Sequence, residues 1–114
     1  MVIKRGDIWW ADLPEPSGAE SGYRRPVIIV QADKFNRSEI STIIIAVITT
    51  NLRFANSLGN VSLTASQSGL PKGSVVNVTQ LYTIDESLLL EYVSFVTDKK
   101  MEQINEGLRH VLFL

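Results

Sequence analysis

The stretch Thr42–Thr50 reads TIIIAVITT, and it limits how this chain can fold more than any other feature. Its run of branched apolar residues is too short to span a membrane, which takes about 20 residues. A short, uninterrupted run rich in β-branched residues favours a strand that is covered on both faces. We therefore expect this segment to be a buried β-strand.

Further short strands are predicted before and after this run. Gly6–Leu13 is rich in aromatic and β-branched residues and stops at Pro14. Pro26–Gln31 begins with a proline, which is tolerated at the first residue of a strand because no ladder donor is needed there. Three more strands are expected along the rest of the chain, at Leu58–Thr64, Ser74–Tyr82 and Tyr92–Val96.

One helix is clearly predicted, at the end of the sequence. Apolar residues recur at helical spacing over Asp98–Leu112, with Thr97 or Asp98 as the N-cap. A turn or single helical turn is expected at Asp33–Ser38, and Asp85 could cap another. The pattern indicates a mainly β fold, a small bent sheet or barrel of about six or seven strands closed on one side by the C-terminal α-helix.

Length and composition narrow the class of protein. The 114 residues fit one domain spanning 1–114. No cysteine is present, so disulfides and thiolate metal sites are excluded. The first residues do not form a signal peptide, and we expect a cytoplasmic protein that does not enter the membrane. The net charge is −1, but segment 34–84 has four basic residues and one acidic residue (Lys34, Arg37, Arg53 and Lys72 against Glu39), which favours an anionic partner.

The available side chains exclude several kinds of catalysis. His110 is the only histidine, so one subunit cannot use a pair of histidines as acid and base. No metal-ligand spacing and no nucleotide-binding fingerprint is present, so we expect neither a metal nor a cofactor. The remaining candidates for catalytic groups are arginine side chains, hydroxyls and amides.

The segment SGYRRPVIIV places two arginines directly before a proline. Alternation along the strand puts Arg25 on the face of Val27 and Ile29, and Arg24 on the opposite face. The planar fork of Arg25 suits a phosphate, although a salt bridge at the sheet edge is the alternative. Thr49 ends the buried strand, and we expect its hydroxyl at the same rim.

Polar residues occur on both predicted faces of Ser74–Tyr82. Asn77 and Thr79 share one face with Leu81, and Gln80 lies on the other. Polar groups on both faces indicate an edge strand or a functional surface. The candidates for stacking on bases are Tyr23, Phe54, Tyr82 and the pair Trp9 and Trp10, with core packing as the alternative for the two tryptophans.

Taken together, KRGDIWWADL, RRPVIIVQAD, IAVIT and QLYTID resemble the MazF/PemK group of toxin endoribonucleases, or mRNA interferases, from toxin–antitoxin systems. The resemblance implies an SH3-like barrel with a C-terminal helix, a homodimer and a small antitoxin partner. It also implies metal-independent cleavage of single-stranded mRNA. Arg25 matches the family's catalytic arginine, Thr49 its threonine at the strand end, and Gln80 a glutamine near the substrate groove.

Two departures from the family pattern affect the expected site. The chain has Gly18, Ala19 and Glu20 where the family has G-S-E, so a serine contact is lost or moved to Ser21. One branch of the family has an arginine and an aspartate as acid and base, at the positions of Asn77 and Thr79. The chain is therefore expected to rely on Arg25 and Thr49. The proposed RNA contacts are Glu20, Ser21, Tyr23, Arg53, Asn77, Thr79 and Gln80.

The resulting hypothesis is attack of the ribose 2′-OH on the adjacent phosphorus, which gives a 2′,3′-cyclic phosphate and a 5′-OH end. The alternative is a catalytically silent RNA- or protein-binding toxin of the same fold, such as a gyrase poison. That relative depends on a tryptophan near its C-terminus, and this chain has none after Trp10.

Overall fold

The computed structural model describes residues 2–14 and 23–114. Within these residues the chain forms six strands, three α-helices and two 3-10 turns. The strands are β1 (Asp7–Leu13), β2 (Tyr23–Ile29), β3 (Thr42–Thr49), β4 (Val61–Leu63), β5 (Ser74–Asp85) and β6 (Leu89–Phe95). The helices are α1 (Asp33–Asn36), α2 (Ala65–Ser68) and α3 (Asp98–Leu112), and the 3-10 turns are η1 (Leu52–Phe54) and η2 (Glu86–Leu88).

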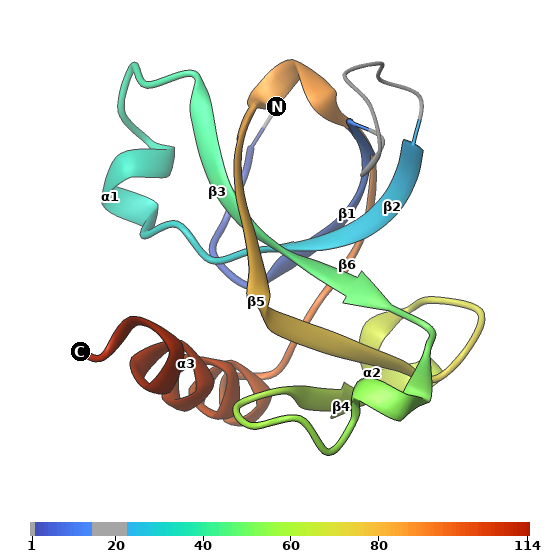
Figure 1. Cartoon of the computed structure of the whole chain (residues 1–114). Helices are drawn as coiled ribbons and strands as arrows, with labels where there is room; N and C mark the ends of the chain where they lie inside the picture. Colours follow the sequence, from blue (N-terminus) through green and yellow to red (C-terminus); the bar gives the residue numbers. More distant parts are fainter. Residues whose placement is uncertain (1, 15–22) are drawn as a thin grey trace.

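The six described strands form one antiparallel sheet in the order β4-β5-β3-β2-β1-β6. The sheet curls into a half-barrel, and α3 lies at one end of it beside β4 and β5 (Figure 1). The predicted fold class, mainly β with a C-terminal helix over Asp98–Leu112, is confirmed. β3 lies inside the sheet, between β2 and β5, as its apolar sequence requires.

Two apolar clusters cover the two faces of the curled sheet. Ala46 and Ile48 of β3 belong to the cluster that includes Ile104 and Leu108 of α3. Ile45 and Val47 belong to the cluster inside the curl. The second half of β3 is therefore buried on both faces, as predicted. The first half is not, because Ile44 is 40% exposed.

Helix α3 begins at its predicted N-cap, where the Thr97 hydroxyl accepts a hydrogen bond from the Lys100 amide at 3.2 Å. The helix packs closely against the loop before β4. A Cβ on Gly107 would lie 2.1 Å from the carbonyl oxygen of Gly59, so any side chain there would displace the helix. In residues 2–14 and 23–114, none of the helices combines the length and apolar character needed to cross a bilayer.

Strand β5 bends at a bulge that the sequence pattern did not predict. Asn77 pairs with Val47 and Leu81 pairs with Ala46, so three residues of β5 have no partner on β3. The bulge reverses the alternation of faces. Leu81 consequently packs on the face of Val76, and the predicted grouping of Leu81 with Asn77 is wrong.

Strand β2 begins at Tyr23, three residues earlier than predicted. Its first residues pair with β1, where Ala11 lies opposite Arg25 and Trp10 lies opposite Pro26. Pairing with β3 begins only at Val27, so the start of β2 is paired on one side and tolerates a proline. Arg25 therefore lies within the strand, and not just before its first residue as predicted.

Candidate functional site

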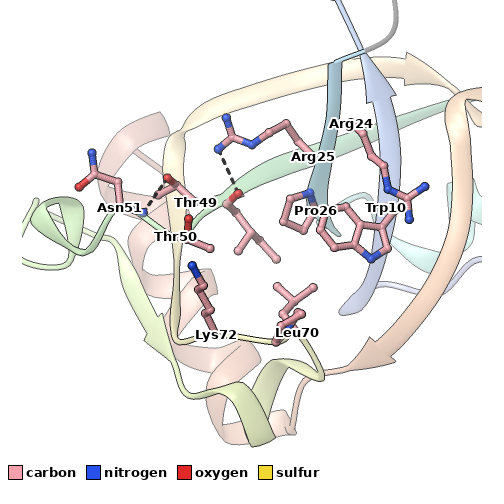
Figure 2. A pocket seen from close by; sticks show the side chains of 11 residues that line it. Trp10, Arg24, Arg25, Pro26, Thr49, Thr50, Asn51, Leu70 and Lys72 are labelled. Atoms are coloured by element: carbon pink, nitrogen blue, oxygen red, sulfur yellow. Dashed lines mark hydrogen bonds between the residues drawn. The ribbon is translucent and has the colours of Figure 1, made fainter.

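A cavity of about 510 Å³ opens where the start of β2 meets the end of β3 and the loop before β5 (Figure 2). Its walls come from four segments that are far apart in the sequence. The lining residues are Trp10, Arg24, Arg25, Pro26, Ile48, Thr49, Thr50, Asn51, Leu70, Pro71 and Lys72. Three of them are cationic, and no carboxylate of the described residues is among them. The cavity therefore favours an anionic ligand.

Arg25 is fixed by two hydrogen bonds at the edge of this cavity. Nη2 donates to the carbonyl oxygen of Ile48 at 3.2 Å, and Nη1 donates to the hydroxyl of Tyr23. The guanidinium carbon also lies 5.2 Å from the centre of the Tyr23 ring. The Ile48 carbonyl accepts this bond where β3 extends beyond its pairing with β2. In the part of the chain that the structure describes, Arg25 has no ion pair, so the alternative of an edge salt bridge is not found there.

Thr49 lines the same cavity, directly after the residue that holds Arg25. Its side chain is largely buried, with 9% of the residue exposed. Its Oγ1 accepts a hydrogen bond from the Asn51 amide at 3.1 Å, which fixes the hydroxyl at the end of β3. The structure thus brings the two predicted catalytic residues to one rim (Figure 2).

A smaller cavity of about 100 Å³ lies on the other side of Arg25. Arg25, Tyr23 and Gln80 all line it, together with Leu13, Pro14, Val47 and Tyr82. Arg25 therefore lines both cavities. Two of the proposed RNA contacts, Tyr23 and Gln80, line the smaller one. Tyr82 was, like Tyr23, a candidate for stacking on bases, and the structure places it in the lining of this cavity.

Three of the proposed contacts form a cluster at the bulge of β5. The Asn77 amide nitrogen donates to Gln80 Oε1 at 3.3 Å, and the Thr79 hydroxyl donates to Asn77 Oδ1 at 2.8 Å. Asn77 is 7% exposed, so its amide holds the other two side chains in place. Thr79 and Gln80 are exposed and accessible to a ligand.

Asn77 and Thr79, at the bulge of β5, are in neither lining, and the same is true of Arg53; two further predicted residues lie outside the described part of the chain. Arg53 lies on η1 with its guanidinium carbon 5.0 Å from the centre of the Phe54 ring, outside both linings. Glu20 and Ser21, with Gly18 and Ala19, lie outside the described residues.

Sequence reasoning missed part of the cavity wall. Arg24 was expected to point away from the site, but it lines the cavity with its guanidinium carbon 4.8 Å from the centre of the Trp10 ring. Lys72 was counted only as part of the basic surplus of segment 34–84. Lys72 and Arg25 line the same cavity, but they are far apart in the sequence. The basic surplus was therefore the one sequence signal that could have pointed to Lys72.

The described residues form no candidate metal site at this cavity. Across residues 2–14 and 23–114, no three side chains of the ligating types lie close enough together to hold a metal ion. The positive charge of the cavity comes from its arginines and its lysine.

Comparisons with known proteins identify the family. Residues 4–112 match the model described as "PemK-like, MazF-like toxin of type II toxin-antitoxin system". Endoribonuclease MazF2 of Mycobacterium bovis is 46% identical over 114 residues, with both chains covered completely. Endoribonuclease EndoA of Bacillus subtilis is 35% identical over 114 residues, which is 100% of this chain and 97% of EndoA.

Solved structures agree in fold. One titled as an endoribonuclease in complex with its cognate antitoxin, from a mycobacterial species, has a TM-score of 0.80 at 26% identity, covering 98% of this chain and 96% of that chain. A MazF structure from Deinococcus radiodurans has a TM-score of 0.79 at 18% identity, covering 100% and 99%, and that likeness concerns the fold alone.

The chain therefore belongs to the PemK-like, MazF-like toxins of type II toxin–antitoxin systems. The resemblance seen in the sequence is confirmed. The predicted enzyme class is confirmed as well, because the curated full-length relatives are named endoribonucleases.

Proposed function

We propose that this toxin cleaves single-stranded mRNA by intramolecular transesterification, without a metal ion. The observation that carries the proposal is the placement of Arg25, whose guanidinium is fixed between two cavities beside Thr49. The ribose 2′-oxygen attacks the adjacent phosphorus, and the bond from phosphorus to the 5′-oxygen breaks. The 2′-OH loses a proton and the 5′-oxygen gains one, leaving a 2′,3′-cyclic phosphate and a 5′-OH.

Arg25 stabilises the negative charge that the phosphorane gains. A guanidinium presents several N–H groups in one plane, so two of them can bind two phosphate oxygens together. The bonds to Ile48 and Tyr23 hold the group in place before the substrate arrives. A preorganised donor of this kind contributes about 3–4 kcal/mol to transition-state stabilisation.

Thr49 positions the phosphate or the 2′-OH through its hydroxyl. The bond from the Asn51 amide occupies a lone pair of Oγ1 and leaves the hydroxyl proton free to rotate toward a phosphate oxygen. An ordinary hydroxyl is too weak a base to take the 2′-OH proton unaided, so its role is orientation.

The unstacked bases are read around the bulge of β5 and the smaller cavity. Gln80 and Thr79 offer exposed amide and hydroxyl groups supported by Asn77, and Tyr23 offers a ring for stacking. Arg53 extends the basic surface beyond the cavity. Glu20 and Ser21 are proposed contacts on the grounds of sequence alone.

The same proposal includes the protein's partners. Residues 1–114 act as one toxin domain in the cytoplasm, inhibited by a cognate antitoxin protein. A homodimer is supported by apolar side chains beside α3. Ile44, Leu112 and Leu114 line a cavity of about 300 Å³ and are exposed, so a second copy would cover them.

The test is incubation of the purified protein with a long single-stranded RNA in the presence of EDTA. We expect discrete cuts whose products carry a 5′-OH and a 2′,3′-cyclic phosphate, and no cuts in single-stranded DNA, which lacks the 2′-OH. Cutting that disappears with EDTA, or products with 5′-phosphates, would exclude this mechanism. Intact RNA that still shifts on a gel would indicate a silent binder.

A further inference from the structure

The three cations of the larger cavity differ in how they are held. Arg25 donates to Ile48 and Tyr23. Arg24 stacks on Trp10 and lies 3.9 Å from a carboxylate oxygen of Glu91. Among residues 2–14 and 23–114, by contrast, the Lys72 ammonium has neither an ion pair nor a hydrogen bond. Lys72 lines the cavity, and none of the described carboxylates compensates its charge there.

The backbone beneath Lys72 is nevertheless firmly placed. Two residues before it, Leu70 is buried in the core and its amide donates to Ser68 Oγ at 3.0 Å. Two residues after it, Ser74 is buried, and its hydroxyl donates to the Lys72 carbonyl oxygen at 3.0 Å. The lysine stem therefore starts from a fixed point, and Figure 2 shows the amine directed toward Thr50, away from Trp10 and Arg24.

An ammonium in this setting suits a second phosphate. Lysine is a compact point charge that binds phosphate without the fixed fork of arginine. An RNA strand carries a phosphate at every nucleotide, so a strand that places one at Arg25 must place another nearby. The neighbouring Thr50 and Asn51 add a hydroxyl and an amide to that side of the cavity.

We infer that Lys72 binds the phosphate next to the cleaved one along the RNA strand. The inference rests on the proposed function, and it extends the site across the cavity from Arg25. Lys72 is then a phosphate-binding residue that fixes the path of the strand, while Arg25 acts on the reacting group. Its loss should raise KM more than it lowers kcat.

The first test measures the salt dependence of binding. The probe is an RNA oligonucleotide spanning one mapped cut, with a single 2′-deoxynucleotide at the cut so that it stays intact. Each phosphate contact to single-stranded RNA contributes about 0.7 to the slope of log K against log salt. We expect Lys72→Gln to reduce that slope by about 0.7, and Lys72→Arg to retain it.

The matched control is Lys34→Gln. Lys34 is also an exposed lysine, with no partner among the described residues, but it lies on α1 outside the cavity. We expect the slope of this variant to equal that of the wild type. A Lys72→Gln slope that also equals the wild type would overturn the inference.

The second test locates the phosphate. Single phosphates of the same probe are replaced one at a time by neutral methylphosphonates. We expect the replacement next to the cut to weaken binding by the wild type and to have no further effect in Lys72→Gln. If that replacement costs both proteins the same, Lys72 does not bind this phosphate.

These outcomes are separable from failure of the proposed function. If the wild type cuts no RNA, the nuclease proposal fails. The salt dependence of binding to the uncut transcript is then measured for the wild type and Lys72→Gln. A slope lower by about 0.7 in Lys72→Gln still supports a phosphate contact, and equal slopes exclude it.

Discussion

Arg5 and Arg25 make the same kind of hydrogen bond in two different surroundings. Arg5 Nε donates to the carbonyl oxygen of Val30 at 2.8 Å, as Arg25 Nη2 does to that of Ile48 at 3.2 Å. The Arg5 backbone amide also donates to Asp33 Oδ1 at 2.7 Å, a bond that holds the pKa of Asp33 below its ordinary value. Arg25 has no such carboxylate among the described residues.

The contrast shows how two similar side chains take different roles. The groups around Arg5 bind one another, since Asn36 donates both to Asp33 at 3.2 Å and to the Gln31 carbonyl oxygen at 2.9 Å. This network joins the segment before β1 to the segment after β2. Among residues 2–14 and 23–114, no carboxylate pairs with the Arg25 guanidinium, which is held by neutral acceptors and lines both cavities, where it can bind a ligand.

The largest expected effect separates these two arginines. Arg25→Ala should lower kcat by about a hundred- to a thousandfold, because it removes a preorganised donor to the transition state, and should leave the thermal midpoint nearly unchanged. Arg5→Ala should do the reverse, lowering the midpoint while cutting persists. Single-turnover cleavage and thermal melts of both variants test this. Undiminished cutting by Arg25→Ala would move the chemistry elsewhere.

The next prediction concerns the network alone. Asp33→Asn should reduce the free energy of unfolding at neutral pH by about 1–3 kcal/mol, because the bonds that Asp33 accepts become uncharged, and should not change kcat. The pKa of Asp33 is lowered in the folded state, so its contribution is complete above the unfolded value of about 3.9 and is lost as pH falls through the folded pKa.

Urea unfolding of wild type and Asp33→Asn at several pH values measures this difference. The difference in the free energy of unfolding between the two proteins should become smaller as the solution is acidified below about pH 4. A difference that stays constant would show that the Asp33 charge does not contribute to stability.

A smaller effect is expected at Thr49. Thr49→Val keeps the shape of the side chain and removes the hydroxyl, and the loss of one neutral hydrogen bond should lower kcat about tenfold. Thr49→Ser keeps the hydroxyl and serves as the control. Equal loss in both variants would point to packing at the end of β3 instead of the hydroxyl.

The smallest effect is expected at Gln80. Gln80→Ala removes an exposed amide that we propose reads bases, so it should alter the relative frequency of cuts along a transcript more than the overall rate. Primer extension across one long RNA compares the cut positions of the two proteins. Identical patterns would remove Gln80 from sequence recognition.

Local sequence patterns predicted the fold where the determining contacts are local. The spacing of Ile104 and Leu108 and the cap at Thr97 define α3 within one segment. The bulge at Thr79 depends on how β5 meets β3, and the early start of β2 depends on β1. Those pairings join distant segments, so alternation along one strand could not reveal them.

The candidate site divides in the same way. Arg25 and Thr49 could be proposed from the sequence because each stands at a position that its own strand and the family motif define. Lys72 and the stacked pair of Arg24 and Trp10 reach the cavity only through the curl of the sheet. The sequence shows that these residues are cationic or aromatic, but it does not show that they lie at the same cavity.

The most direct test of the proposed chemistry is single-turnover cleavage, in EDTA, of an RNA with one 2′-deoxynucleotide at a mapped cut. We predict that cutting at that position stops while other sites in the same molecule are still cut, because the attacking oxygen is missing only there. Continued cutting at the modified position would show that the RNA does not supply the nucleophile, and would contradict the role given to Arg25.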